Sequence, residues 1–240
     1  MLVEVCANSL QSAINAQEAG ANRIELCSEL AVGGITPSYG LLKAVRQKVS
    51  IPIHILIRPR SGDFTYSEEE IKMMQQNIEL CIDLGFDGIV SGVLFSDFRV
   101  DLKRTQQLIK SAGNLHFTFH RAFDWVVNPL EVLPELEAIG VDTILSSGQQ
   151  NSALEGIELL KVLNEKSASV TIMPGGGIRN NNIEVFKKAG FSAAHLSGTK
   201  FSKTLPSPPK VSMNSSSFLK DDEIAISDLD SIRQIVKVVK

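Results

Sequence analysis

One pattern recurs four times along the chain and constrains the fold more than any other feature. Each copy has an apolar residue, a glycine, two further residues and then a β-rich run. The copies are "AGANRIEL" (Ala19–Leu26), "LGFDGIV" (Leu84–Val90), "IGVDTIL" (Ile139–Leu145) and "AGFSAAHL" (Ala189–Leu196). Their glycines are about 50 to 65 residues apart, the length of roughly two strand-helix units. Such spacing is typical of a fold that repeats one supersecondary unit.

Eight β-rich runs, separated by segments of helical period, fit this repeat. The runs are Leu2–Cys6, Arg23–Cys27, Ile53–Ile57, Gly88–Val90, Leu115–His120, Thr143–Leu145, Val170–Met173 and Ala193–Leu196. We therefore predict an α/β fold, a single (β/α)8 TIM barrel domain over residues 1–240. A doubly wound open sheet is the alternative. No G-x-G-x-x-G motif follows the first run, so no nucleotide cofactor is indicated.

The segments between the runs carry helix start and stop residues. Ser67-x-x-Glu70 is a capping box that opens an apolar-periodic helix ending at Gly85. Asn128-Pro129 opens another helix, which contains Pro134. Residues 202–225 are rich in Ser, Pro and Lys, and we predict a long, partly mobile loop there. A last helix is expected over Asp228–Val239.

Composition excludes several broad classes of protein. The formal net charge is −3, which argues against a nucleic-acid partner. No apolar run approaches the roughly 18 residues of a membrane helix, and the N-terminus does not resemble a signal peptide. Three cysteines, an odd number, indicate free thiols. We expect a cytosolic (cytoplasmic) protein without a membrane partner.

Charged and polar residues interrupt the β-rich runs, although a parallel strand covered on both faces should be nearly all apolar. Glu4, Glu25, Arg58 and His120 are the exceptions, and all lie toward the C-terminal ends of their runs, where barrels carry their active sites. Alternation predicts that neighbouring strands bring the two carboxylates together. Either these groups form a pocket, or the carboxylates pair with Arg58 and Arg23 as a structural network. We favour the pocket.

The stretch "TFHRAFDW" gathers several of these polar groups at one strand end. We predict that His120 points into the pocket and that Asp124, on the following turn, orients His120 or pairs with an arginine. Trp125 would form an apolar wall. The predicted catalytic residues are Glu4, Glu25, Arg58, His120 and Asp124.

Glycine-rich turns follow the seventh and eighth runs, where many barrels bind phosphate through backbone N–H groups. A tight turn between strand and helix is the other interpretation. We predict that arginines and these turns bind an anionic substrate. The predicted substrate-binding residues are Arg60, Arg121, Gly175, Gly176, Gly177, Ser197 and Gly198.

Two of the three cysteines occupy matched positions on neighbouring strands. Cys6 ends "VEVC" and Cys27 ends "IELC", and two thiolates suit a soft ion such as Cu(I). No CxxC motif supports this metal site. Cys81 lies on the apolar face of a predicted helix, where a thiol is inert core.

The motifs together resemble the CutC family. They are "EVCANS", "GANRIELC", "GGITPS", "IRPRSGDF" and "TFHRAFD", then "SSG" and "MPGGGI", in order over residues 1–199. The resemblance implies a cytosolic (β/α)8 barrel, commonly oligomeric, named for a role in copper homeostasis. It also implies that Cys6 and Cys27 correspond to the cysteines proposed to hold Cu(I) in a relative.

Two functions therefore remain open at the level of the sequence. One is copper handling, with Cu(I) bound by Cys6 and Cys27 without turnover. The other is an enzyme acting on a small anionic, for example phosphorylated, substrate by acid–base chemistry. No lysine lies within the eight runs, which disfavours a strand-borne Schiff-base lysine. No G-x-S-x-G appears, which disfavours an α/β-hydrolase.

Overall fold

The protein is described by a computed structural model that covers residues 1–213 and 220–240. Its centre is an eight-stranded parallel sheet in the order β7-β6-β5-β4-β3-β2-β1-β8. The strands are β1 Leu2–Ala7, β2 Arg23–Leu26, β3 Ile53–Leu56, β4 Gly88–Ser91, β5 His116–Phe119, β6 Thr143–Ser146, β7 Thr171–Pro174 and β8 Ala193–Leu196. One parallel bridge, between Gly175 and His195, brings the two edges of the sheet together. The predicted (β/α)8 barrel is confirmed.

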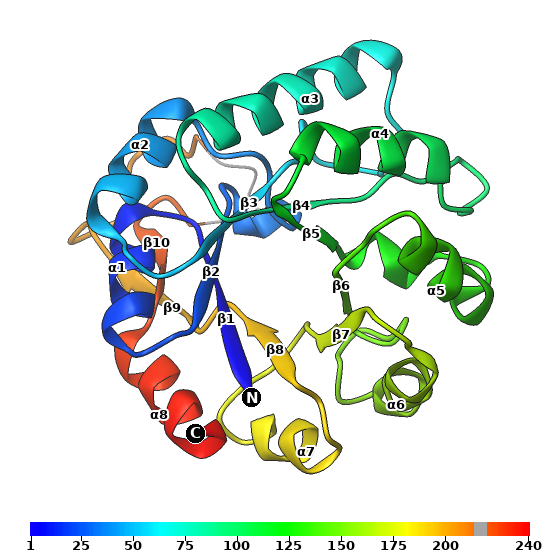
Figure 1. Ribbon diagram of the computed structural model, residues 1–240. Coiled ribbons are helices and arrows are strands. Elements are labelled where there is room, and N and C mark those ends of the chain that lie inside the picture. The colour runs from blue at the N-terminus through cyan, green and yellow to red at the C-terminus, as the bar shows by residue number, and fades with distance from the viewer. Residues whose placement is uncertain (214–219) are drawn as a thin grey trace.

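Helices surround the strands and alternate with them along the chain (Figure 1). They are α1 Leu10–Glu18, α2 Tyr39–Lys48, α3 Glu68–Asp83, α4 Leu102–Ala112, α5 Pro129–Ala138, α6 Ile157–Lys166, α7 Ile183–Lys188 and α8 Leu229–Val239, with short 3-10 turns at Leu30–Val32 and Arg121–Trp125. Among the residues described, no helix is long and apolar enough to cross a membrane.

The predicted helix boundaries agree with the structure because their caps are local. The Ser67 side chain accepts from the Glu70 N–H while the Glu70 carboxylate accepts from the Ser67 N–H, so the capping box is complete at the start of α3. Gly85 follows that helix with φ +73°, a conformation that glycine adopts without strain. The α5 helix continues through Pro134.

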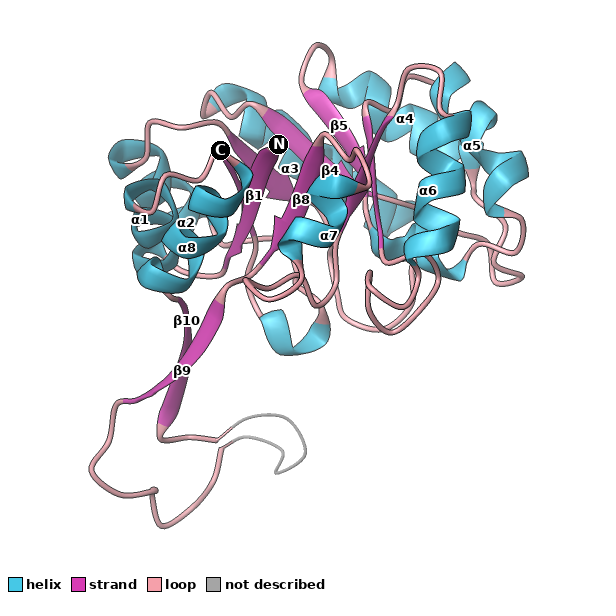
Figure 2. Ribbon diagram, turned by 90° about the horizontal axis from the view of Figure 1, so that it is seen from below, coloured by secondary structure: helices cyan, strands magenta, loops and turns pink. Residues whose placement is uncertain are grey.

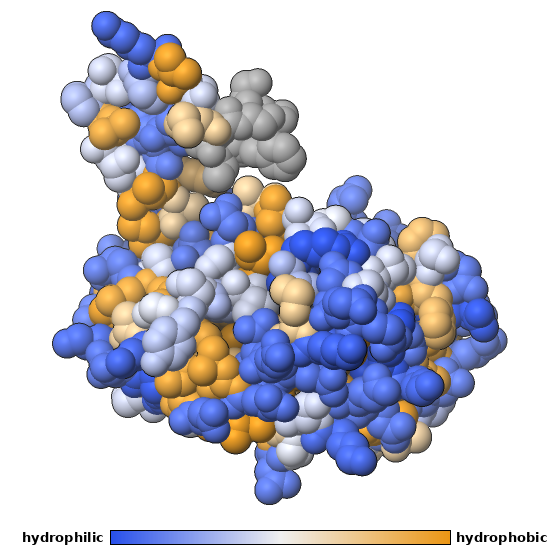
Figure 3. Space-filling view, turned by 90° about the horizontal axis from the view of Figure 1, so that it is seen from above, coloured by the Kyte–Doolittle hydropathy of each residue, from blue (hydrophilic) through white to orange (hydrophobic). Residues whose placement is uncertain are grey.

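The segment after β8 departs from the predicted loop. Strands β9 (Thr199–Lys203) and β10 (Glu223–Ser227) pair antiparallel and form an arm that projects from the barrel (Figure 2). The prediction of a loop over 202–225 is therefore wrong at both ends. Residues 214–219, which belong to the predicted loop, lie outside the described part of the chain. Apolar side chains are exposed on the arm, where it leaves the barrel and beyond (Figure 3); they include Phe201, Leu205 and Ile224.

The alternation of the strands separates an apolar layer from a polar barrel interior. On β5, Phe117 and Phe119 are fully buried in the core that joins strands and helices. The alternate residues of β5, His116 and Thr118, face the interior, where the His116 ring is hydrogen-bonded to the Thr143 hydroxyl of β6 at 2.9 Å. The four histidines of the chain all lie on strands or at strand ends. The interior therefore carries the titratable groups from which a site can be built.

Candidate functional site

A cavity of about 1440 Å³ opens at the C-terminal ends of the strands, larger than most small-molecule pockets. The predicted site residues that line it are Cys6, Glu25, Arg58, His120, Arg121, Asp124, Gly176, Gly177, Ser197 and Gly198. Of the predicted residues, all described, those outside the lining are Glu4, Cys27, Arg60 and Gly175. Most of the predicted set thus shares one cavity.

Glu4 lies below the cavity, fully buried within the barrel. It accepts a hydrogen bond from Arg23 Nε at 2.5 Å, and its other oxygen lies 2.8 Å from His195 Nδ1. Burial alone would raise the pKa of Glu4, but the bond with His195 and the Arg23 charge outweigh it and hold that pKa well below its usual range. For Glu4, a structural ion pair therefore fits better than a catalytic role.

The register of β1 and β2 differs from the expected pairing. Glu4 lies opposite Arg23, and Cys6 lies opposite Glu25, so the two carboxylates do not face each other directly. Parallel strands in a tilted barrel are staggered, and alternation along one strand does not reveal the stagger. The consequence is that Glu4 gains a cation, whereas Glu25 gains a thiol as its neighbour.

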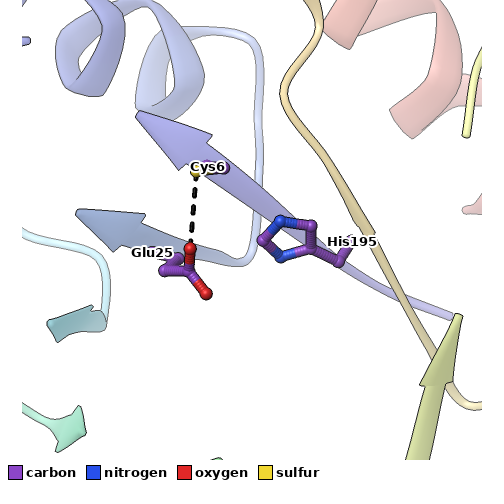
Figure 4. A group of neighbouring side chains, drawn as sticks. All are labelled: Cys6, Glu25 and His195. Atoms are coloured by element: carbon purple, nitrogen blue, oxygen red, sulfur yellow. Dashed lines mark hydrogen bonds between the residues drawn. The ribbon is translucent and has the colours of Figure 1, made fainter. Parts of the chain in front are cut away.

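Glu25 and the two thiols form a buried cluster just above Glu4. The Sγ atoms of Cys6 and Cys27 are 3.3 Å apart. Cys6 Sγ is also 3.4 Å from Glu25 Oε1 (Figure 4). Donor atoms of Cys6, Glu25 and His195 all lie within 4.8 Å of one another. The other oxygen of Glu25 has no hydrogen-bond partner among the described residues.

The surroundings of this cluster shift the pKa values of Cys6, Glu25 and His195. The hydrogen bond to Cys27, together with burial, raises the pKa of the Cys6 thiol well above its ordinary value. Burial raises the pKa of Glu25. His195 behaves in the opposite way: burial would lower its pKa, but the Glu25 charge and the bond to Glu4 outweigh burial and raise it.

His120 points into the cavity from the end of β5. Its Nδ1 accepts from the Ala122 N–H at 3.2 Å, and its buried Nε2 has no partner among the described residues. A Cβ at Gly92 would lie 2.9 Å from the ring, so glycine there makes room for the imidazole. Burial, aided by the Arg58 charge, lowers the pKa of His120 to about 3. The ring is therefore neutral near pH 7.

The two arginines of "IRPR" differ in their surroundings. Arg58 is buried, and its guanidinium donates to the carbonyls of Val32, Gly34 and Gly62 at 2.7 to 2.9 Å. It therefore fixes the loops around the mouth, and it pairs with neither carboxylate of the alternative network. Arg60 lies outside the cavity lining and is bound by carboxylates of the loop after β3 and of α3.

Asp124 pairs with an arginine and does not orient His120. It accepts from Arg121 Nε at 2.8 Å and from the Ser146 hydroxyl at 2.6 Å, while Arg121 also donates to the Ser147 hydroxyl at 2.8 Å. These contacts place the Arg121 guanidinium at the cavity wall. Trp125 lines the same cavity but is 45% exposed, so the expected wall is partly in solvent.

The glycine turn after β7 is only partly a cavity element. Gly176 and Gly177 line the cavity with φ values of +102° and +74°, and no acceptor within the described chain takes their N–H groups. Gly175 instead lies inside, where an added Cβ would be 2.4 Å from Leu145. The predicted anion-binding turn thus reduces to Gly176 and Gly177.

Sequence reasoning missed His195 as a site residue, and it considered Arg23 only as a partner in a structural network. His195 interrupts the apolar run "AAHL" of β8 just as Glu4 interrupts "VEVC", so the same rule could have identified it. His54 is a further interior residue, 3.9 Å from Glu4 and 4.9 Å from the His116 ring. Burial lowers the pKa of His54 to about 3.

Comparison with known proteins places these residues in a family. The sequence profile of the CutC family matches residues 1–200. A family protein CutC from Enterobacter sp. (strain 638) is 46% identical over 207 residues, which cover 86% of this chain and 83% of the relative. One from Edwardsiella ictaluri (strain 93-146) is 47% identical over 197 residues, 82% of this chain and 78% of the relative.

Solved structures agree with the sequence comparison. CutC from Streptococcus agalactiae, whose crystal structure is known, is 33% identical, with a TM-score of 0.78 over 82% of this chain and 98% of that one. Thiamine phosphate pyrophosphorylase from Pyrococcus furiosus, 16% identical with a TM-score of 0.61 over 99% of this chain and 95% of that one, shares the fold alone. The resemblance drawn from the motifs is thus confirmed, and the chain belongs to the CutC family.

Proposed function

We propose that this protein binds Cu(I) through Cys6 and Cys27 as part of copper homeostasis. The observation that carries the proposal is the 3.3 Å contact between the two Sγ atoms at the floor of an open cavity that Cys6 lines. Two thiolates are soft donors that suit Cu(I), and the imidazole of His195 is a compatible third donor. The residues present therefore fit the ion, which is cargo of the protein and not a resident cofactor.

Copper binding at this site would be coupled to proton release. The pKa of Cys6 is raised by the bond to Cys27 and by burial, so the thiol is protonated near neutral pH and the ion must displace that proton. Apparent Cu(I) affinity should therefore rise with pH. The three thiols are free, in agreement with the cytosolic location that we propose with this function.

Titration with Cu(I) under reducing, oxygen-free conditions tests the proposal. We expect saturation near one equivalent per chain and loss of that binding in the Cys6→Ser, Cys27→Ser double variant. Cys81→Ser is the matched control, because Cys81 is a buried thiol on α3, away from the cavity lining. Unchanged stoichiometry in the double variant, or equal loss in the control, would contradict the proposal.

A second candidate function is acid–base chemistry on a small anionic substrate. It is favoured by the buried, unpartnered Nε2 of His120 in the same cavity as Arg121 and the free N–H groups of Gly176 and Gly177. Because Nδ1 accepts from the Ala122 N–H, the neutral imidazole carries its proton on Nε2, and it can donate that proton to a substrate through an atom that no described residue engages. Arginine and backbone N–H groups together suit phosphate or carboxylate.

Calorimetric titration with inorganic phosphate separates this candidate from copper binding. Arg121→Gln should weaken phosphate binding by about ten-fold or more. Arg60→Gln is the control, because Arg60 lies outside the cavity. Equal phosphate affinity in the wild-type protein and Arg121→Gln would contradict the proposed anion site. It would not bear on the copper proposal.

A further inference from the structure

Three aromatic side chains meet at the rim of the cavity, on loops that follow β3, β4 and β5. The Trp125 ring lies 4.9 Å from the Phe64 ring and 6.2 Å from the Phe98 ring, centroid to centroid. Trp125 is 45% and Phe98 is 47% exposed, although aromatic rings gain free energy from burial. We call Phe64, Phe98 and Trp125 the aromatic rim.

The backbone at Phe98 is strained, and the strain is maintained by its own turn. Its φ is +63°, a region that bulky residues rarely adopt. The turn is closed by the Phe98 N–H donating to the Phe95 carbonyl at 3.0 Å and the Phe95 N–H donating to the Arg99 carbonyl at 2.8 Å. Glycine would form the same turn without strain. An exposed, strained phenylalanine therefore needs an explanation beyond local folding.

Trp125 separates two hollows of different chemistry. It lines the main cavity together with Arg58, His120 and Arg121, and it lines a smaller hollow together with Phe98. The Arg58 guanidinium also lies 5.0 Å from the centre of the Phe64 ring. Cationic and aromatic surfaces therefore adjoin at the mouth of the barrel.

We propose that the aromatic rim binds the ring of a ligand whose anionic group occupies the cavity at Arg121 and the Gly176–Gly177 turn. An aryl phosphate is the simplest member of this class. The inference rests on the second candidate function and names its substrate class.

The arrangement of charges supports an anionic group at this position. Asp124 is engaged by Arg121, Ser146 and Ser147, so it does not present an open carboxylate to the ligand. Glu25, the other carboxylate of the lining, lies deeper, beside Cys6. The Phe64 ring is 4.8 Å from the His120 ring, which places an acid–base group next to the ring subsite. A ligand ring on the rim would thus bring its anionic substituent to both Arg121 and His120.

Fluorescence of Trp125 provides a direct test, because it is the single tryptophan of the chain. The full-length protein is titrated with phenyl phosphate, inorganic phosphate and phenol. We expect phenyl phosphate to change the emission and to bind about ten-fold more tightly than either inorganic phosphate or phenol. Inorganic phosphate should compete with phenyl phosphate.

Variants of Phe98 show whether the rim supplies the extra affinity. Phe98→Ala and Phe98→Gly should lose most of the advantage of phenyl phosphate and leave the affinity for inorganic phosphate unchanged. Phe98→Gly should also keep or raise the melting temperature, because glycine relieves the strained φ, so unfolding would not explain the loss. Tyr39→Ala is the control: Tyr39 is 55% exposed and lines neither hollow.

The possible failures are distinguishable. If inorganic phosphate binds and phenyl phosphate binds no more tightly, or if the Phe98 variants behave like the wild-type protein, the rim inference is wrong and the anion site stands. If phenol matches phenyl phosphate, the rim is an apolar docking surface and the ligand class is wrong. If neither phosphate binds, the second candidate function fails together with the inference.

Discussion

At the scale of single residues, the most constrained contact is the buried pair of Glu4 and Arg23. Both side chains are within the barrel, and among the described residues the only hydrogen-bond partner of Arg23 Nη2 is the Met173 sulfur, at 3.6 Å. Removing one member of such a pair leaves a buried charge without its counterion. The pair therefore belongs to the stability of the barrel more than to its chemistry.

We predict that Glu4→Gln destabilises the protein by about 3–5 kcal/mol. The substitution keeps the shape of the side chain and removes the charge that Arg23 needs. Urea unfolding measures the change. Glu18→Gln on the exposed face of α1 is the control and should change stability by less than about 0.5 kcal/mol. If Glu4→Gln also lowers stability by less than about 0.5 kcal/mol, the structural role of the Glu4–Arg23 pair is contradicted.

The histidines make stability depend on pH. The folded-state pKa values of His54 and His120 are lowered to about 3 by burial, so between pH 6.5 and 3 the unfolded chain binds protons that the folded chain does not. Stability should therefore fall as the pH drops below 6.5. Glu4, whose pKa is lowered, adds to this loss below about pH 4.5. His195 has the opposite effect on stability. Its folded-state pKa is raised, so the stabilisation that it provides is present at low pH and is lost as the pH rises through that pKa.

His120→Asn should flatten this acid dependence by about 1.4 kcal/mol per pH unit. Asparagine can still accept from the Ala122 N–H but does not titrate, so stability at pH 7 should change little. Urea unfolding at several values between pH 4 and 7 measures the slope. If the variant loses stability at pH 7 and keeps the wild-type slope, His120 acts as a structural member of the core.

The inward-facing residues of β1 and β2 were predictable from the sequence, but their partners across the two strands were not. Alternation along a strand identified the inward face of β1 and β2, because its period is local. The partner of each inward residue depends on the stagger between strands, so the Glu4–Arg23 alignment was not predictable. The contact of the two thiols was predicted in spite of this, and Cys6 and Cys27 meet at 3.3 Å.

At the scale of elements, the barrel strands and capped helices were predictable and the arm was not. The strands β9 and β10 carry little apolar alternation of their own, and they are joined across residues 204–222. Their pairing joins segments that are far apart in the sequence, so no short window of sequence predicts it. An isolated two-stranded hairpin is also marginal in water. The base of β10 is held against the barrel, where the Asn8 side chain donates to the Ala225 carbonyl at 3.2 Å.

We predict that the barrel does not depend on the outer part of the arm. Lys203 and Glu223 are paired across the hairpin, so replacing residues 204–222 with Asn-Gly supplies a two-residue turn at the correct register. The melting temperature should stay within about 2 °C of the wild-type value, since surface changes rarely exceed 0.5 kcal/mol. Differential scanning calorimetry measures it. A large drop would assign the removed segment a role in folding.

At the scale of the whole molecule, the proposed copper site lies next to the closure of the barrel. Cys6 is on β1, Cys27 directly follows β2, and His195 forms the bridge that joins β8 to the end of β7. An ion bound by these side chains would connect the strands on both sides of β1. The unfolded chain separates the same donors, so the ion should bind the folded state more tightly.

Cu(I) should therefore raise the melting temperature of the intact protein. An ion at 100 times its dissociation constant stabilises the folded state by about 2.7 kcal/mol, which corresponds to roughly 5–10 °C for a chain of this size. Calorimetry with and without Cu(I) measures the shift, and a Cu(I) chelator should abolish it. The Cys6→Ser, Cys27→Ser variant should show no shift, whereas Cys81→Ser should respond like the wild-type protein. A shift of equal size in the double variant would mean that copper stabilises the chain at other donors, and the two thiols would then have no part in the function.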